Sequence, residues 1–264
     1  YNLPPAFSYY FGPYWINNQL LDKPYKRYRN NLEVLNCLIE KINLIAPKIK
    51  FSLSPEFLDL RPFQWWNFHK PRNGQFKINL RYTAKYSFYN NINEEHIINS
   101  FRLDDKRKKI KQIEKQKQLS IFFEVNQSID FYLEMYKNTI LRSGGKIEIK
   151  ELELLGKIIE ISSKKLNTSV APHLIELNAK DFDYPLGFQI ILIGKNQSYA
   201  VAQSTNEEGR KLNGNVFLNY KSLCYANSQK VLSFDFNGAN SPNRADDKHA
   251  FGANEASYYE LSLE

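Results

Sequence analysis

The stretch FDFNGANSPNRADDKHAFGA (234–253) holds the side chains of this sequence best suited to chemistry. Asp235 directly follows an apolar strand pattern, where burial would raise the pKa of its carboxyl and let it act as an acid or base. Lys248 precedes a Phe-Gly pair, and its ammonium could meet a diphosphate or a developing oxyanion. Plainer roles stay open, because the carboxylate could cap the following turn and the lysine could lie in solvent.

Groups suited to substrate binding surround these two residues. Asn240 and Ser241 offer hydrogen bonds in the polar loop, and Arg244 adds a positive charge. Tyr258 and Tyr259 alternate along a strand pattern, so one of them should point towards the loop. We choose Tyr258 as the hydroxyl that binds substrate. The stretch therefore predicts the floor of a binding pocket.

Arg142 is a further candidate, earlier in the chain. It ends a helix pattern that begins near SIDFYLEMY and stops at Gly144. A guanidinium there could bind a phosphate, or it could simply complement the negative end of the helix dipole.

The elements that would position these residues mix helices with strands. Apolar spacing of three to four residues predicts a helix over 29–46, ended by Pro47, and further helices follow around 102–119, 128–144, 151–165 and 214–227. Alternating or apolar runs predict strands at 48–54, 119–125, 187–194, 198–205, 231–236 and 257–263. FQWWNF and QFKINLRY read as strands or strand-loop clusters, and 1–25 as an extended or looped segment. The mixture predicts an α+β (mixed α/β) protein without a doubly wound parallel sheet.

Positive charge is concentrated in one segment. The chain of 264 residues has a net charge of +8, and RLDDKRKKIKQIEKQKQL (102–119) holds eight Lys or Arg against three acids. Such a balance favours anionic partners, such as phosphorylated cofactors, nucleotides including nucleotide sugars, tRNA or a membrane surface. A solvated helix face is the plainer interpretation of the same segment.

Several classes of protein are disfavoured by composition. Cys37 and Cys224 form no motif, and His69, His96, His173 and His249 lack the spacing of metal ligands, so we expect no metal site. Neither a P-loop nor a Rossmann glycine motif occurs. No apolar run is long enough for a transmembrane helix, and no signal peptide is visible, although the chain begins at Tyr and a leader could precede it. We therefore expect a cytoplasmic protein.

The order of motifs over 187–259 resembles the FemAB-like branch of the GNAT acyltransferase superfamily. A Gly-Phe-Gln hairpin leads to AQST and a helix, then to FDFNG, a polar loop, a Lys before Phe-Gly, and Tyr258-Tyr259. The basic segment followed by FYLEMYKNTILRSGG, with Thr139 and Arg142, resembles the same branch. The resemblance implies tandem GNAT-like lobes, each a mixed, largely antiparallel sheet flanked by helices, which we place at 1–118 and 119–264.

The resemblance also implies an activity. It points to an N-acyltransferase that moves an acyl group from acyl-CoA, such as acetyl-CoA, to an amine of an amino sugar or amino acid in cell-envelope or polysaccharide biosynthesis. Asp235 and Lys248 would be catalytic, and Gln203 would lie where the superfamily holds the acyl carbonyl. The sequence departs from the superfamily in NEEGRKLNGN (206–215), whose Gly209 and Gly214 lack the usual pyrophosphate-binding spacing. Aminoacyl-tRNA, the donor of FemX-like transferases, therefore stays open as the alternative.

A different class of function also stays open. The basic segment and the exposed aromatics could belong to a non-catalytic module that binds nucleic acid or polysaccharide on the same fold.

Overall fold

A computed structural model describes residue 7 and residues 23–46, 48–57, 59–89, 92–164 and 170–263. The segment 1–25, expected to be extended or looped, lies almost wholly outside the described residues. The chain forms two compact units, one of Tyr1–Tyr82 with Ala256–Glu264 and the other of Thr83–Glu255. The expected lobe boundary after residue 118 falls inside the second unit, so the division into two lobes stays a prediction.

The first unit is small and has its own core. It contains α1 (Pro24–Ile45), β1 (Ile49–Ser52), α2 (Arg61–Trp65), a 3₁₀ turn η1 (Pro71–Asn73) and the outer parts of β2 (Phe76–Ser87) and β8 (Asn254–Leu263). The strand order is β1-β8-β2, and β1 pairs antiparallel with β8. Leu35 and Ile39 of α1 are buried together with Phe51, Phe63 and Leu261. The predicted helix over 29–46 is thus confirmed, with an earlier start.

The second unit is a sheet of strand order β2-β7-β6-β5-β4-β3. Its further elements are α3 (Glu94–Asn99), α4 (Asp104–Gln116), β3 (Leu119–Phe122), α5 (Ile129–Arg142), α6 (Ile149–Ser163), β4 (Ala171–Ala179), β5 (Gly187–Ile193), β6 (Gln197–Thr205), α7 (Glu207–Lys211), α8 (Gly214–Ser228), β7 (Ser233–Asp235) and α9 (Pro242–Ala250). Neighbouring strands pair antiparallel except β6 and β7, which are parallel. The mixed, largely antiparallel fold class is confirmed.

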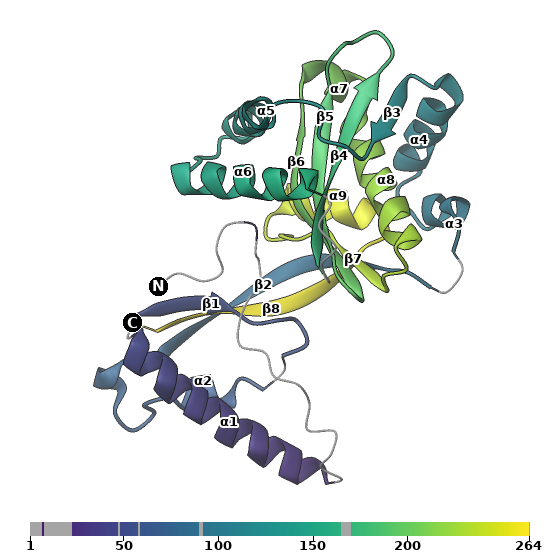
Figure 1. The fold of residues 1–264 in the computed structure, drawn as a ribbon. Helices are drawn as coiled ribbons and strands as arrows, with labels where there is room; N and C mark the ends of the chain where they lie inside the picture. Colours follow the sequence, from purple (N-terminus) through teal and green to yellow (C-terminus); the bar gives the residue numbers. More distant parts are fainter. Residues whose placement is uncertain are drawn as a thin grey trace. The chain divides into compact units, whose positions relative to one another are not determined.

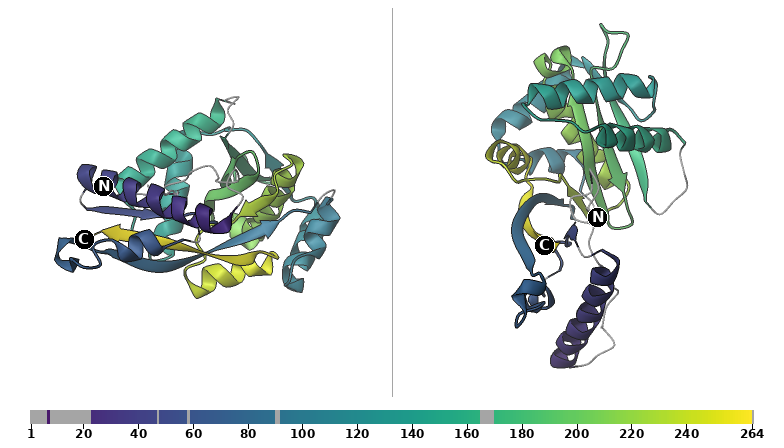
Figure 2. Two further views of the ribbon diagram at one scale, coloured as in Figure 1. Left: turned by 90° about the horizontal axis from the view of Figure 1, so that it is seen from below. Right: turned by 90° about the vertical axis from the view of Figure 1, so that its left-hand side faces the viewer.

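Helices cover both faces of this sheet (Figures 1 and 2). α5 and α6 lie on one face, and α8 lies on the other with α3 and α4 outside it. The position between sheet and helices explains why α8 is apolar around most of its circumference, with Val216, Leu218, Leu223 and Ala226 all buried.

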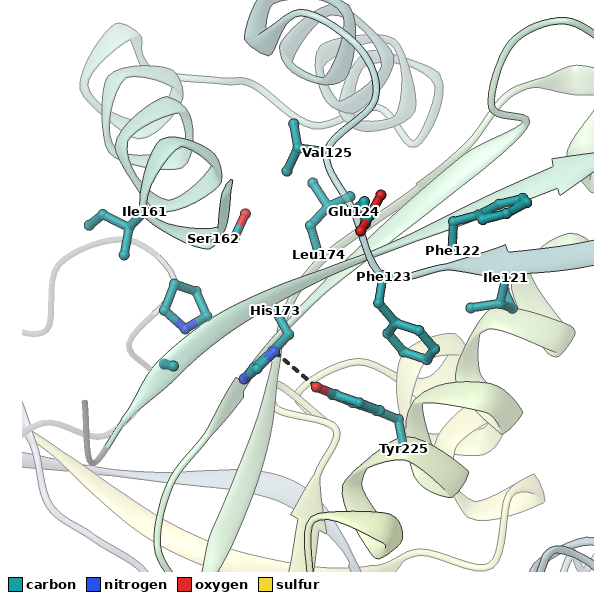
Figure 3. Close-up of a pocket in the computed structure, with 12 residues that line it drawn as sticks. Ile121, Phe122, Phe123, Glu124, Val125, Ile161, Ser162, His173, Leu174 and Tyr225 are labelled. Atoms are coloured by element: carbon teal, nitrogen blue, oxygen red, sulfur yellow. Dashed lines mark hydrogen bonds between the residues drawn. The ribbon is translucent and has the colours of Figure 1, made fainter. Parts of the chain in front are cut away.

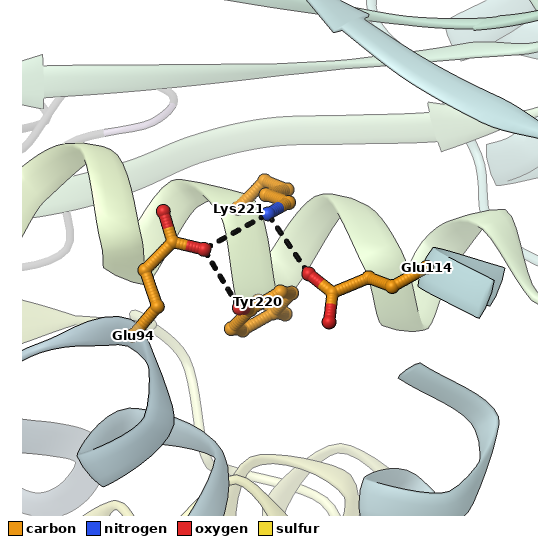
Figure 4. A network of polar contacts seen from close by, with 4 residues as sticks. All are labelled: Glu94, Glu114, Tyr220 and Lys221. Atoms are coloured by element: carbon orange, nitrogen blue, oxygen red, sulfur yellow. Dashed lines mark hydrogen bonds and ion pairs between the residues drawn. The ribbon is translucent and has the colours of Figure 1, made fainter. Parts of the chain in front are cut away.

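One polar network fastens α8 to α3 and α4 (Figure 4). The Lys221 Nζ lies 3.0 Å from Glu94 Oε2 and 3.1 Å from Glu114 Oε1. The Tyr220 hydroxyl donates to the same Glu94 oxygen at 2.9 Å. These bonds to Lys221 and Tyr220 hold the pKa of Glu94 below its ordinary value, although partial burial opposes them as the largest single influence.

Two expectations about local structure were wrong. Residues 242–250 form the helix α9, whereas the sequence suggested a continuous polar loop; Pro242 stands at the first turn, where its missing N–H is tolerated. Most of FQWWNF belongs to α2 and the turn after it rather than to a strand. QFKINLRY, by contrast, lies in and just before β2, as expected.

Candidate functional site

The sheet of the second unit opens between β6 and β7. The two strands pair only from Gln197↔Ser233 to Tyr199↔Asp235, after which β7 ends and β6 continues to Thr205. The Nδ2 of Asn237 then donates to the Ala200 carbonyl, which closes the end of the ladder. Beyond that point β6 is still paired with β5 on one side, and on the other side β7 no longer accompanies it. Along 201–205, β6 therefore has an open backbone edge, with no strand on that side among the described residues.

Local geometry indicates which backbone groups face the open edge. The register between β5 and β6 shifts at Ile190/Ile191, a β-bulge that turns the second half of β6. The Ser204 carbonyl faces β5, since a Cβ on Gly187 would come within 2.7 Å of it. Because backbone groups alternate along an antiparallel ladder, those of Gln203 face away from β5. The open edge thus presents hydrogen-bonding groups of the main chain.

Asp235 lies at the last pair of the β6–β7 ladder and is fully buried. Its Oδ1 accepts a hydrogen bond from the Thr83 hydroxyl at 2.5 Å and from the Asn237 amide at 2.8 Å. Burial raises the pKa of Asp235 to about 7, against the opposing effects of the Asn237 amide and the Lys248 charge. The expected rise of this pKa is therefore confirmed, and the contacts are those of a carboxyl that shapes the next turn.

The turn after Asp235 has an unusual backbone. Asn237 has φ 55° and Gly238 has φ 46°, two successive residues in the left-handed region. The Lys248 Nζ, on α9, donates to the Gly238 carbonyl at 2.7 Å. Asp235 and Lys248 thus hold the same turn from its two ends.

The other candidates of this stretch lie around α9. Asn240 and Ser241 are exposed, and Ser241 occupies the N-cap position of α9 without a side-chain capping bond. Arg244 lies on α9, but its side chain is outside the described part. Tyr258 is buried on the section of β8 that belongs to the first unit.

The far end of β6 carries a second set of predicted residues. The Gln203 Nε2 donates to the Asn215 carbonyl at 3.1 Å, so this side chain ties β6 to α8. Next to it, the hydroxyls of Ser204 and Thr139 lie 2.6 Å apart, and Ser204 also donates to the Met135 carbonyl at 2.8 Å. These bonds join α5 to β6 and fix the C-terminal end of the open edge.

Two arginines lie near this end of β6. Arg142 is exposed at the end of α5, and Arg210 of α7 donates from Nη1 to the Thr205 carbonyl at 2.8 Å. Partial burial, and then the positive charge of Arg210, lower the pKa of Arg142, so the two guanidiniums are within electrostatic reach. Like charges held together favour an anion between or beside them. Arg210 was missed by the sequence reasoning, although it lies within NEEGRKLNGN.

The glycines of that segment serve packing. A Cβ on Gly209 would come within 2.5 Å of the Leu186 carbonyl oxygen. A Cβ on Gly214 would come within 2.8 Å of the Gly209 carbonyl oxygen and would collide with Leu177. The N-terminus of α8 is therefore packed against α7 and β4, and close packing accounts for the glycine at both positions.

Other features of the described chain complete the picture. No group of three or more His, Cys, Asp or Glu residues suited to a metal ion occurs among the described residues. Two cavities of the second unit lie elsewhere, and neither is lined by a predicted site residue. None of the helices in the described ranges is both long and apolar enough to cross a lipid bilayer.

Solved structures with the same architecture were found, although no family model and no curated protein matches the chain in sequence. FemX is similar with a TM-score of 0.62 at 13% identity, over 87% of this chain and 77% of that chain. The C-terminal domain of a putative lysylphosphatidylglycerol synthetase from Agrobacterium fabrum is similar with a TM-score of 0.52 at 10% identity, over 86% and 72%. A tandem GNAT protein from the clavulanic acid biosynthesis pathway has a TM-score of 0.50 at 6% identity, over 82% and 63%.

The resemblance stated from the sequence is thereby confirmed at the level of the fold: this chain has a FemAB-like fold of the GNAT type.

Proposed function

We propose that this chain is an acyltransferase whose donor lies along the open edge of β6. The observation that carries the proposal is the parting of β6 and β7 after Tyr199↔Asp235. It leaves this section of β6 without a second strand partner among the described residues, next to the turn held by Asp235 and Lys248, and Arg142 and Arg210 lie near its far end. An acyl donor that combines amide groups with phosphates fits such an edge.

The residues present suit acyl-CoA as donor. The arginine pair would hold its phosphates by charge-assisted hydrogen bonds, and the backbone groups of β6 would pair with its extended amide-containing arm. A β6 N–H near the parting would stabilise the oxyanion that forms when the acceptor amine attacks the acyl carbonyl. The C–S bond then breaks, and the proton that the amine loses is taken up by the leaving thiolate, so that the products are the amide and free CoA thiol.

Asp235 and Lys248 act through the turn they hold. Both side chains are engaged with residues 237–238, so they position the wall of the parting beside the acyl carbonyl. We therefore assign them as positioning residues. Asn240, Ser241 and Arg244, which stand where this turn meets α9, are the proposed acceptor contacts.

The acceptor we propose is an amine of an amino sugar or amino acid in cell-envelope biosynthesis, and we propose that the reaction takes place in the cytoplasm. Aminoacyl-tRNA is the alternative donor, since it also carries phosphates that an arginine pair could bind. A non-catalytic binding module is less favoured, because Lys106, Arg107 and Lys109 of the basic helix α4 are engaged in ion pairs with Asp247, Asp104 and Asp105.

The test combines binding and turnover. Acetyl-CoA is titrated by calorimetry, and release of free CoA is then followed with amino-sugar nucleotides and amino acids as acceptors. We expect saturable binding and acceptor-dependent release, with Gln203→Ala reducing turnover only slightly because the main chain does the work. Transfer from charged tRNA without CoA binding would change the donor, and failure with both donors would overturn the proposal.

A further inference from the structure

A cavity near the β3 edge of the same sheet has no part in the proposed acyl transfer. It has a volume of about 710 Å³, within the range of about 300–1,000 Å³ typical of small-molecule sites. Its walls are β3 with the segment that follows it, the start of β4, the end of α6 and one residue of α8 (Figure 3). All of these elements belong to the second unit.

The cavity arises because β3 parts from β4. Their ladder ends at Phe122↔Glu176, so the start of β4, from Ala171 to Ile175, pairs with β5 but not with β3. The chain after Phe122 turns away and returns at Asn126. This arch, residues 123–125, forms one wall of the cavity.

The arch is fixed by a buried carboxylate. Glu176 is fully buried, and it accepts hydrogen bonds from the Asn126 amide at 3.2 Å and from Asn126 Nδ2 at 2.7 Å. The Tyr132 hydroxyl donates to the same carboxylate and accepts from the Gln127 amide at 3.1 Å. Because these bonds and the Phe122↔Glu176 pair fix both ends of the arch to β4, the cavity is preformed and a ligand need not open it.

Aromatic side chains dominate the lining. Phe123 stacks on Tyr225 with ring centroids 4.4 Å apart, and both Phe122 and Phe123 remain about half exposed, at 50% and 45%. In Figure 3 His173 points to Tyr225 from β4, beside these rings. Exposed aromatic faces next to a hollow are favourable partners for a further aromatic ring.

His173 supplies the polar contact. Its Nδ1 lies 3.0 Å from the Tyr225 hydroxyl, which fixes the orientation of the imidazole. Its Nε2 forms no hydrogen bond to another residue of the described chain. Burial lowers the pKa of His173, so the imidazole is neutral near pH 7 and its Nε2 can accept or donate one hydrogen bond according to tautomer.

The charge of the described lining does not favour an acyl donor. Among these residues Glu124 is the acid, and they include no Lys or Arg, although the whole chain has a net charge of +8. A phosphate-bearing ligand would find no cation among the described lining residues, whereas they would not repel a neutral or cationic ligand.

We propose that this cavity is a second ligand site, which binds a small neutral or monocationic aromatic molecule through the rings of Phe122, Phe123 and Tyr225 and the Nε2 of His173. The site is independent of the acyl-transfer proposal, because it stands at β3–β4 and that one at β6–β7.

Three matched phenols test the proposal by calorimetry: p-cresol is neutral, tyramine is cationic and 4-hydroxyphenylacetate is anionic. We expect saturable binding of the first two, with the anion at least about tenfold weaker. Phe123→Ala should weaken tyramine about fivefold through loss of one stacked ring, and Tyr89→Ala, at an exposed aromatic outside the cavity, should leave it unchanged.

Imidazole resonances of His173, observed by NMR, should shift on addition of tyramine. Thermal unfolding checks that Phe123→Ala is folded, and Phe122→Ala replaces it if it is not. Absence of saturable binding at millimolar concentration would overturn the proposal. Equal affinity for all three phenols, or an affinity that neither phenylalanine variant changes, would overturn it as well.

Discussion

The sheet of the second unit opens in two places, and the two openings share one construction. β6 parts from β7 after Tyr199↔Asp235, and β3 parts from β4 after Phe122↔Glu176. A fully buried carboxylate lies at the last residue pair of each ladder. In both places the carboxylate accepts hydrogen bonds from the segment that leaves the sheet, so it fixes where pairing ends.

The surroundings of the two carboxylates differ. Asp235 accepts from the Thr83 hydroxyl and the Asn237 amide and lies within the field of Lys248, and the edge it opens leads to Arg142 and Arg210. Glu176 accepts from a hydroxyl, an amide N–H and an amide NH₂, and the described lining of its opening has aromatic rings and no Lys or Arg. If both ligand proposals hold, one way of ending a ladder serves ligands of opposite charge preference.

The largest effect on stability is expected from removing the Glu176 carboxylate, which accepts hydrogen bonds where β3 parts from β4. Glu176→Ala would leave the Tyr132 hydroxyl and two donors of Asn126 without their partner, which should lower the free energy of unfolding by about 5 kcal/mol. Urea denaturation measures this. Glu134→Ala, at an exposed ion pair with Lys137, should change it by less than about 1 kcal/mol. If Glu176→Ala is as stable as Glu134→Ala, the Glu176 carboxylate does not fix the end of the β3–β4 ladder, and the likeness between the two openings is lost.

The β6–β7 carboxylate should make stability depend on pH. The pKa of Asp235 is raised from 3.8 to about 7, so between these values the folded chain keeps a proton that the unfolded chain has released. Stability from this group is complete below pH 3.8 and is lost as pH rises through 7. Relative to Asp235→Asn, the unfolding free energy of the unmodified chain should fall by up to about 4 kcal/mol from pH 4 to pH 7.5. Parallel pH profiles of the two proteins would contradict this.

The charge preference of the β6 edge predicts a smaller effect on binding. Arg210→Ala removes a charge-assisted contact to the donor phosphates and should weaken CoA about 30-fold, equivalent to about 2 kcal/mol. Lys211→Ala, at the neighbouring exposed lysine paired with Glu207, is the control and should change affinity less than threefold. Neither variant should alter tyramine binding at the β3–β4 cavity; an effect there would merge the two openings into one site.

The smallest effect concerns the turn that Asp235 and Lys248 share. Lys248→Met keeps most of the side-chain volume, loses the bond to the Gly238 carbonyl and should cost about 1 kcal/mol of stability. Because the Lys248 charge lowers the pKa of Asp235, its loss should raise that pKa. Carboxyl ¹³C resonances followed against pH would report the change, and an unmoved or lower midpoint would show that Lys248 does not act on Asp235.

Periodic segments of the fold could be predicted from the sequence. The helices α1, α5 and α8 and the hairpin of β5 and β6 have regular apolar patterns that their packing on a sheet preserves. The helix α9 was not predicted, because its polar sequence PNRADDKHA has only a weak apolar stripe. FQW in α2 resembled a strand because aromatic residues favour both strands and buried short helices.

The candidate site was only partly predictable. Asp235 and Lys248 are close in sequence, and one local turn explains their meeting. Thr83 and Glu176 lie in ordinary strand patterns, and their partners are 152 and 44–50 residues distant. Such pairings depend on strand order, which periodicity does not specify. Arg210 was hidden for the same reason, since only the fold brings α7 beside the end of α5.

Pro172 stands on the β4 margin that β3 leaves unpaired. It has no N–H, so an incoming extended chain would lose a ladder hydrogen bond at that position. The proline thereby protects this strand edge against pairing with a strand of another molecule and against aggregation. The opening between β3 and β4 can thus admit a small ligand while the strand beside it does not pair with another polypeptide.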